Sequence, residues 1–340
     1  MTIYDIAQEA NVSVATVSRV MTGSAKVSEE KREKVETLIR KYDFKPNALA
    51  KGLSETKSKI LGIMVADIRN PFYATLFMEC EKEAGKYGYS LILYNTLSNP
   101  DLEVTYLEKM ISMRVEAVIK IGGRIDDVVT DMEYVEQVNK VANSIPIVIT
   151  GKLDGADCYS VRIDAFQATD LVMEHLFSLG HTDIAMIGGS TDTQSTVERY
   201  MRYKQQLRRR GIQIRDEYMI HHDYYDDRGG YECMKNLLLL EDRPSAVIAV
   251  NDFTAVGAMR AMAEAGIRVP NDMSVISYDD TIMANIMIPK LTSVSYNYEN
   301  FGQMIIETVL KAINGEEQPR LKTIISELSA RDSCGPCTKK

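Results

Sequence analysis

The chain has 340 residues, of which 45% are hydrophobic and 26% are charged, and its formal net charge is −8. This composition is typical of a globular protein with more than one domain, and the longest apolar runs are far shorter than the roughly 20 residues that span a bilayer. The N-terminus has neither the basic nor the apolar segment of a secretion signal, and the five cysteines are too scattered for a disulfide framework. We therefore expect a cytoplasmic protein with reduced cysteines.

The first 45 residues are predicted to form three short helices. Thr2 can cap the first helix, with Asp5 completing a capping box. Ser13 and Ser28 can cap the second and third helices, and Gly23 can end the second. A helix, a three-residue turn, a second helix and a bracing third helix form the helix-turn-helix pattern. The apolar residues that recur at helical spacing, and so can share one small core, are Ile3, Ile6, Ala10, Val17, Val20, Val35, Leu38, Ile39 and Tyr42.

The second of these helices, within VSVATVSRVMTG, combines β-branched and small residues with one long charged side chain, Arg19. Val17 and Val20 are predicted to fill the core, while the other side chains are short enough for the helix to approach the edges of DNA bases. Arg19 would then make the bidentate contact to guanine that dominates discrimination in the major groove. The pattern alone is equally consistent with a three-helix packing unit that exposes an arginine.

Residues 45–59, KPNALAKGLSETKSK, are polar and basic and have no apolar face long enough to pack. A helix that begins at Pro46 and reaches Leu53 would include Gly52, and one or two such turns are too short to be stable alone in water. We expect this linker to become ordered only when a partner holds it. Residues 1–59 carry eleven Lys and Arg against eight Asp and Glu, so a locally basic head precedes an acidic body.

From Lys59 onward, apolar strands alternate with amphipathic segments. The strands are predicted within KILGIMVAD, YSLILYN, EAVIKIGG, IPIVITG, YSVRI, DIAMIGG, YMIHHDYY, SAVIAVN, MSVISYDD, TSVSY and KTIISELS. This alternation predicts an α/β body of two doubly wound, parallel-sheet lobes. Ligands of such folds bind at the carboxyl ends of the strands, so a cleft between the lobes would collect the loops after Ala66, Gly123, Gly151, Gly189, Asn251 and Tyr278.

The common motifs of nucleotide-binding and hydrolytic enzymes, such as G-x-G-x-x-G, G-x-S-x-G and H-E-x-x-H, are absent from the sequence. His221 and His222 are neighbours on a predicted strand and point to opposite faces, which makes them a poor metal chelate. Cys334 and Cys337, in CGPC, have the spacing of a redox site, but an activated thiolate lies at a helix N-terminus and only TKK follows here. We expect no cofactor and no metal, and interpret the last residues as a frayed tail.

Several segments resemble the LacI/GalR family of bacterial transcriptional repressors. TIYDIAQEANVSVATVSRVMTG resembles the DNA-binding head of that family and KPNALAKGL its hinge. The likeness continues through LGIMVADIRNPFY, SLGHTDIAMIGG, AVNDFTAVGAMRAMAEAGIRVPNDMSVISYDD and PKLTSV. The resemblance implies a homodimer that reads a near-palindromic DNA operator, and a periplasmic-binding-protein-like body that senses a small molecule. It implies neither an enzymatic activity nor a membrane partner.

The resemblance also implies roles for residues of the head and hinge. Val14, Ala15 and Arg19 would touch bases, and Asn47 would also contact the DNA. Leu53 would be the wedge that opens a central base step in the minor groove, a kink whose cost of a few kcal/mol is offset by added contact. The residues that would hold the DNA backbone are Tyr4, Ser13, Thr16, Ser18 and Ser28.

In the body, the resemblance implies an effector cleft. Arg199, Asn251 and Asp279 suit a polyhydroxylated ligand, because adjacent hydroxyls donate to a carboxylate and accept from a guanidinium. We expect a sugar or a sugar derivative. Asn251 and Asp279 could instead cap the segments that follow them, and the aromatic residues could belong to the core. The candidate effector-binding residues are Phe72, Tyr73, Asp164, Arg199, Tyr225, Asn251 and Asp279.

The chain also departs from the family pattern. Gly151 stands where several relatives place a ligand-binding Asp, Thr193 where the purine-sensing member has an Arg, and Tyr296 where a Gln is common. These departures disfavour a purine effector. Two alternative functions share the same α/β body: a sugar-binding protein, and a sugar-modifying enzyme that would need a nucleophile or paired acids in the cleft.

The expected domain order is a helix-turn-helix head at residues 1–45, a hinge at 46–59, and an effector-binding and dimerisation body at 60–340. Within the body, we expect the first lobe at about 60–162 plus 292–322. The second lobe is expected at about 163–291 plus 323–333.

Overall fold

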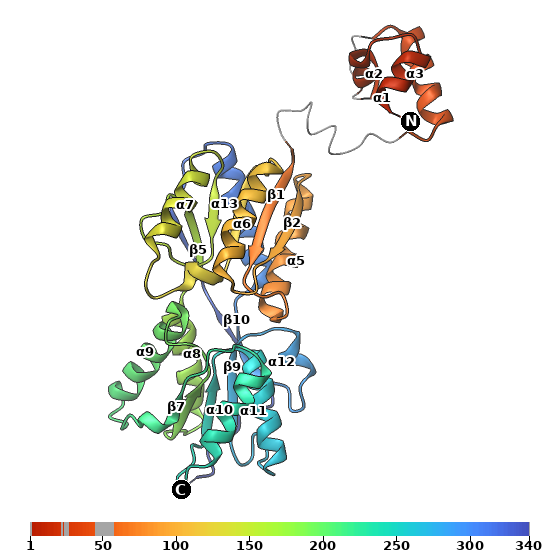
Figure 1. Cartoon of the computed structure of the whole chain (residues 1–340). Coiled ribbons are helices and arrows are strands. Elements are labelled where there is room, and N and C mark those ends of the chain that lie inside the picture. Colours follow the sequence, from red (N-terminus) through yellow and green to blue (C-terminus); the bar gives the residue numbers. More distant parts are fainter. Residues whose placement is uncertain (1, 22, 24–26, 45–57, 340) are drawn as a thin grey trace. The chain divides into compact units, whose positions relative to one another are not determined.

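The computed structural model describes residues 2–21, 23, 27–44 and 58–339, and the chain divides between residues 58 and 59 into two compact units (Figure 1). The predicted hinge helix, with Asn47 and Leu53, lies outside the described residues. In the part of the chain that the structure describes, no helix is long and apolar enough to cross a membrane.

The N-terminal unit contains the three predicted helices, α1 (Ile3–Glu9), α2 (Val14–Met21) and α3 (Glu29–Lys41). Thr2 and Asp5 form the predicted capping box. Gly23 has a φ of +73°, the left-handed conformation in which glycine commonly ends a helix. Ser28 occupies the N-cap position of α3, but its side chain makes no capping hydrogen bond.

The small core of this unit lies where the three helices meet. Val17 and Val20 of α2 are buried, as predicted. Tyr42 is the exception to the predicted core, because its ring is exposed and its hydroxyl donates to Glu9 at 3.0 Å. The buried residues are Ile6, Ala7, Ala10, Val17, Val20 and Val35.

The larger unit consists of two lobes, each built on a six-stranded sheet. The first sheet has the order β11-β5-β4-β3-β1-β2, and its neighbouring strands are parallel. Its strands are β1 (Ile60–Val65), β2 (Ser90–Asn95), β3 (Ala117–Ile121), β4 (Ile147–Ile149), β5 (Tyr159–Ile163) and β11 (Leu321–Ile324). Its helices are α5 (Pro71–Lys86), α6 (Pro100–Ser112), the 3₁₀ helix η1 (Gly123–Asp126), α7 (Met132–Ala142) and α13 (Tyr298–Ile313).

Helices cover both faces of this first sheet, which explains why its central strands are continuous apolar runs. Ile63 and Ile119 point into the core cluster that includes residues of α5 and α13. Met64 and Val118 point the other way, into the cluster that includes residues of α6 and α7.

The second sheet has the order β12-β10-β9-β8-β6-β7, with β12 antiparallel to β10 and the other pairs parallel. Its strands are β6 (Ile184–Ile187), β7 (Met219–Ile220), β8 (Ala246–Ala249), β9 (Ser274–Asp279), β10 (Thr292–Ser295) and β12 (Glu327–Ser329). The other elements of this lobe are α8 (Ala165–Ser178), α9 (Gln194–Arg209), the 3₁₀ helix η2 (Asp216–Tyr218), α10 (Asp227–Leu238), α11 (Asp252–Glu264) and α12 (Ile282–Ile286).

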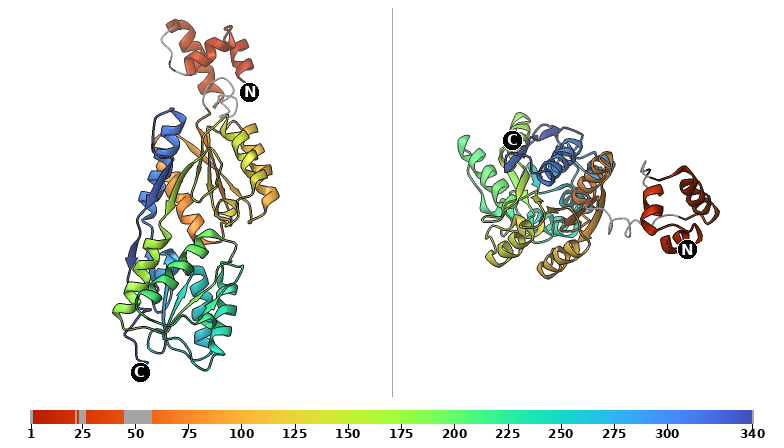
Figure 2. Two further views of the ribbon diagram at one scale, coloured as in Figure 1. Left: turned by 90° about the vertical axis from the view of Figure 1, so that its left-hand side faces the viewer. Right: turned by 90° about the horizontal axis from the view of Figure 1, so that it is seen from above.

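The chain passes between the lobes after β5, after β10 and after β11, and Figures 1 and 2 show the lobes arranged end to end. The second passage comes later than the expected boundary at about 292, because β10 pairs with β9 in the second sheet. The predicted last strand, within KTIISELS, is divided between the two sheets as β11 and β12. The segment TSVSY, which contains β10, has a pattern that fits a strand of either sheet. The sequence alone therefore did not determine to which sheet it belongs.

The interpretation of the last residues as a frayed tail is wrong for residues 331–339. Ser333 is fully buried, and its hydroxyl accepts from the Thr292 amide at 2.8 Å and donates to the Val275 carbonyl at 2.6 Å. Gly335 donates to Ser274 at 3.1 Å. The tail therefore packs against the second lobe because its backbone and hydroxyl groups find partners there, although its side chains are mostly polar.

Candidate DNA-binding surface and effector cleft

The surface of α2 carries the residues expected to contact DNA. Ser13, Ala15 and Arg19 are exposed, as is Ser28 at the start of α3. Tyr4, on α1, is 70% exposed. The partly buried members of the set are Val14, Thr16 and Ser18, and Val14 also packs against the core of the head.

The first turn of α2 is fixed by its own side chains. Ser13 Oγ accepts from the Thr16 amide at 3.2 Å and lies 2.9 Å from the Thr16 hydroxyl. Ser13 is thus the predicted cap of this helix. Because both hydroxyls are held on an exposed turn, the helix presents short polar groups in a defined orientation.

The larger unit contains a cleft of about 920 Å³ between its two lobes. Loops at the carboxyl ends of β1, β3, β4, β8 and β9 line it, together with the first turn of α9, as the topology predicts. Asp164 is the one candidate that does not line the cleft, and its carboxylate instead caps α8 by accepting from the Gln167 amide at 3.0 Å. The candidates that do line it are Phe72, Tyr73, Arg199, Tyr225, Asn251 and Asp279.

Arg199 projects from α9 and is 91% buried, since its relative exposure is 9%. Its Nη1 donates to the Val250 carbonyl at 2.6 Å and its Nη2 to the Tyr296 hydroxyl at 3.0 Å. The guanidinium lies over the ring of Tyr278, 4.3 Å from the centroid. Nε is buried without a hydrogen-bond partner. A buried N–H donor without a partner is costly, and such an exception needs an explanation.

Asp279 ends β9 in a left-handed conformation, with a φ of +100°, and its side chain is buried. Such backbone strain in a non-glycine residue is typical of functional sites. Burial raises the pKa of Asp279 to about 7 from its usual 3.8. In the described part of the chain its carboxylate forms no ion pair.

Asn251 is held by the protein itself. Its Oδ1 accepts from the Thr254 amide at 2.7 Å, which caps α11, and its Nδ2 donates to the Tyr225 carbonyl at 3.1 Å. Asn251 therefore caps the helix that follows it, which was the alternative to a role in ligand binding. The second bond also fixes the loop of Tyr225, whose hydroxyl lies 2.7 Å from the Thr196 hydroxyl and accepts from the Ser190 amide at 3.0 Å.

Two aromatic residues at the start of α5 form one wall of the cleft. The rings of Phe72 and Tyr73 meet edge to face at a centroid distance of 5.2 Å, and Phe72 also contacts Tyr296 at 6.1 Å. Gly122 makes room for Tyr73, since a Cβ there would lie 2.5 Å from the tyrosine hydroxyl. Phe72 and Tyr73 therefore pack against the hydrophobic core and also line the cleft.

Two departures from the family pattern have structural causes. A Cβ at Gly151 would lie 2.2 Å from the carbonyl oxygen of Ile125, so η1 occupies the place of a side chain. Tyr296 is fully buried and its hydroxyl accepts from Arg199, so it belongs to the support of the guanidinium.

Sequence reasoning missed the contacts that join the two lobes across one rim of the cleft. Asp126, in η1, accepts from the Ser195 amide at 3.1 Å and from the Ser195 hydroxyl at 2.6 Å. Beside it, Asp127 forms an isolated bridge with Thr193. Burial raises the pKa of Asp126 to about 6. The loop after Gly123 was expected in the cleft, and Asp126 and Asp127 belong to that loop. Its acidic residues could therefore have been predicted as cleft residues.

A buried charge cluster fixes η1 and hence the direction of Asp126. Glu103 is 1% exposed and pairs with Lys120 Nζ at 2.7 Å and with Arg124 Nε at 3.1 Å. It also accepts from the Arg124 amide at 3.3 Å. Burial lowers the pKa of Lys120 to about 8. Because the carboxylate is satisfied from three directions, the loop that carries Asp126 has one defined conformation.

Comparison with known proteins agrees with this architecture. The family described as "Bacterial regulatory proteins, lacI family" matches residues 2–47, and a "Periplasmic binding protein-like domain" matches residues 173–334. Catabolite control protein A of Priestia megaterium is 33% identical over 318 residues, which cover 93% of each chain. The chain belongs to the LacI family of transcriptional regulators.

Solved structures of LacI-family proteins share this fold over most of the chain. The Lac repressor dimer bound to operator and the anti-inducer ONPF superposes with a TM-score of 0.86 at 26% identity, covering 98% of this chain and 99% of that one. A regulator from Enterococcus faecium with bound ribose superposes with a TM-score of 0.71 at 27% identity, covering 82% of this chain and 99% of that one.

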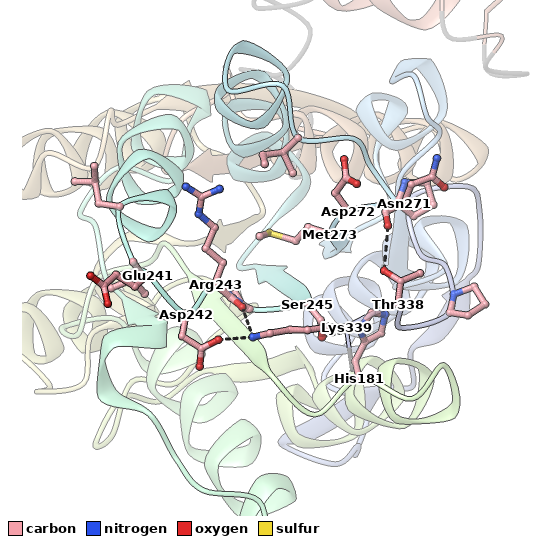
Figure 3. Close-up of a pocket in the computed structure, with 16 residues that line it drawn as sticks. His181, Glu241, Asp242, Arg243, Ser245, Asn271, Asp272, Met273, Thr338 and Lys339 are labelled. Carbon is pink, nitrogen blue, oxygen red and sulfur yellow. Dashed lines mark hydrogen bonds and ion pairs between the residues drawn. The ribbon is translucent and has the colours of Figure 1, made fainter.

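A second cavity of this LacI-family chain, of about 640 Å³, lies in the second lobe beside the C-terminal tail (Figure 3). Lys339 reaches into it and pairs with Asp242 at 2.5 Å. His181 lies at its edge, with Nδ1 2.8 Å from the Ser245 hydroxyl and Nε2 2.9 Å from the Gly335 carbonyl. The polar side chains here hold the tail, so we assign this cavity no ligand. Among the described residues, no cluster suits a metal ion.

Proposed function

We propose that the protein is a homodimeric transcriptional repressor whose affinity for a near-palindromic operator is controlled by a sugar or sugar derivative in the interlobe cleft. The exposed face of α2, with Arg19 among short side chains over a packed core, carries the DNA-binding part of this proposal. Such a helix enters the major groove and reads base edges. The proposal places the protein in the cytoplasm with its DNA.

A single recognition helix reads too few base pairs to be selective, so operator recognition requires two copies. The second lobe supports a self-association surface on and after α12. Ile282, Ile286 and Ile288 are 65%, 63% and 95% exposed. Ile282 and Ile286 are four residues apart and so share one face of α12. A group of neighbouring exposed apolar side chains is typical of an interaction surface. We assign this surface to the second copy, since the Lac repressor relative is a dimer.

The buried, unpartnered Nε of Arg199 supports the effector site. A sugar hydroxyl would accept from it, while Asp279 would accept from a neighbouring hydroxyl. The relative with bound ribose shows that this fold takes a sugar. A ligand that touches both lobes shifts their arrangement by its differential affinity for the open and closed states, and operator affinity would follow.

The test combines DNA selection with ligand binding. The purified protein should enrich a near-palindromic sequence from random duplexes, and Arg19→Ala should relax that sequence at one base position of each half-site without lowering the melting temperature. A sugar that raises the melting temperature should change operator affinity and be recovered chemically unchanged, which separates a sensor from a sugar-modifying enzyme. Enrichment of no sequence, or conversion of the sugar, would refute the proposal.

A further inference from the structure

We propose that the effector is a polyhydroxylated amine, of the amino-sugar class, and that it is neither a neutral sugar nor a sugar phosphate. This inference rests on the proposed function and specifies the ligand of the same cleft. The starting observation is the charge of the lining, which holds ten carboxylates and six basic side chains.

Three of the six basic side chains are paired with neighbouring carboxylates, and Lys152 is one of them, 2.7 Å from Asp154. Arg69 pairs with Asp67 at 2.6 Å. Arg124 pairs with Glu103 at 3.1 Å and with Asp131 at 3.0 Å. These guanidiniums are therefore not available to balance the carboxylates at the centre of the cleft.

We define the centre of the cleft as three charged side chains of the lining, one cation and two carboxylates, that influence one another. Arg199, Asp126 and Asp279 all line the cleft, and the electrostatic influence of Arg199 reaches both carboxyl groups. Neither carboxylate forms an ion pair within the described ranges, and both lie near Tyr73, whose pKa is raised by burial and then by their charges. One negative charge at the centre thus remains uncompensated when both carboxyl groups are ionised.

A ligand ammonium would bring this centre to neutrality, whereas a phosphate would place further negative charge beside the two carboxylates. Like charges in a partly buried site repel more strongly than in solution. Burial raises the pKa values of Asp126 and Asp279 to about 6 and about 7, which agrees with carboxylates that form no ion pair within the described residues. A bound cation would lower both values again.

The hydroxyl part of the ligand follows from a second, independent observation. Arg199 Nε is an N–H donor in a side chain that is 91% buried and lines the cleft, and it has no acceptor. A ligand ammonium cannot accept a hydrogen bond from Nε, because an ammonium group is only a donor. The site therefore requires an oxygen acceptor for Nε and a cation for the carboxylates on one molecule.

The experiment measures binding by calorimetry for matched sets of hexoses: glucose, glucosamine and glucose 6-phosphate, with the corresponding galactose and mannose compounds. We expect an amine to bind at least about tenfold more tightly than its neutral and phosphorylated partners, a difference of about 1.4 kcal/mol. Tighter binding of the neutral or phosphorylated member, or binding of no amine, would overturn the inference.

Two variants test the assigned carboxylates. Asp126→Asn and Asp279→Asn should each reduce the preference for the amine by about tenfold. Asp216→Asn removes the same charge at an exposed position outside the cleft lining and should retain the preference. Equal preference in all three variants would refute the assignment. Operator selection by the ligand-free protein is independent of these results, so a failed amine preference would leave the proposed repressor function intact.

Discussion

The carboxylate of Asp126 in the first lobe accepts two hydrogen bonds from Ser195 in the second, from the amide at 3.1 Å and from the hydroxyl at 2.6 Å. Next to this pair, the Val128 amide donates to the Asp192 carbonyl at 2.9 Å. One rim of the cleft is thus closed by contacts within the protein. The equilibrium between open and closed lobes therefore depends on these bonds as well as on the effector.

Ser195→Ala should shift this equilibrium toward the open form. The substitution removes the hydroxyl donor and leaves a carboxylate oxygen with one partner fewer, and a hydrogen bond to a charged group contributes about 1.5 to 3 kcal/mol. We expect a larger radius of gyration in small-angle X-ray scattering. Ser178→Ala is the matched control, since Ser178 donates only to the His175 carbonyl on the surface of α8. An unchanged radius for Ser195→Ala would contradict this role.

Closure should be favoured at low pH. Burial raises the pKa of Asp126 to about 6 from the usual 3.8 and outweighs the Ser195 hydrogen bonds, which lower it. Opening of the rim would return the carboxylate to water and remove this burial. The closed form therefore binds a proton more tightly than the open form, and lowering the pH through about 6 favours closure. Scattering between about pH 8 and pH 5 should show a decreasing radius. Asp126→Asn should remove this dependence, and a radius that increases as pH falls would show that the sign is wrong.

Asp279→Asn should stabilise the ligand-free fold at high pH. The folded-state pKa of about 7 lies above the usual 3.8, so the folded chain binds the proton more tightly and loses stability as pH rises between these values. Asparagine removes the buried charge, which at pH 8 contributes up to about 4 kcal/mol of destabilisation at 1.36 kcal/mol per pKa unit. The melting temperature should rise at pH 8 and not at pH 4. A rise of equal size at both pH values would refute this cause.

Arg19→Ala should weaken operator binding by about 1 to 3 kcal/mol and relax the preference at one base position of each half-site. The fold should be unaffected, because Arg19 is exposed and the core of the head does not include it. Gel shifts on the selected operator and on its single-base variants measure both effects. Equal loss of affinity for operator and random duplexes would instead indicate a phosphate contact.

Ile286→Glu should convert the dimer to a monomer, because it places a charge on the exposed apolar face of α12. Light scattering at micromolar concentration measures the mass. Ile325→Glu is the matched control, since Ile325 is 64% exposed against 63% for Ile286 and lies outside α12. The dimer should survive in the control. Dissociation by both variants, or by neither, would contradict the assigned surface.

The strands of both lobes could be predicted because each is a short apolar run between turn residues. The carboxyl ends of parallel strands lie at one edge of each sheet, so the loops that follow them could be predicted to line one cleft. Arg199 and Asp279 both line this cleft. β10 was assigned to the wrong lobe because hydrogen-bond partners across strands are not encoded in a single four-residue segment.

The interlobe contacts could not be predicted, because they depend on where two distant loops meet. Asp126 and Ser195 are 69 residues apart, and neither belongs to a motif. The tail was misjudged for a similar reason. Its polar residues resemble a disordered end until Ser274 and His181 supply partners for Gly335.

The order of the last residues determines how the chain tolerates changes at its C-terminus. Ser333 joins the Thr292 amide to the Val275 carbonyl, and the Cys337 amide donates to the Leu179 carbonyl at 2.8 Å. Removing residues from Ser333 onward would expose this edge of the second sheet and leave the Thr292 amide without its acceptor, although the deleted segment does not line the cleft.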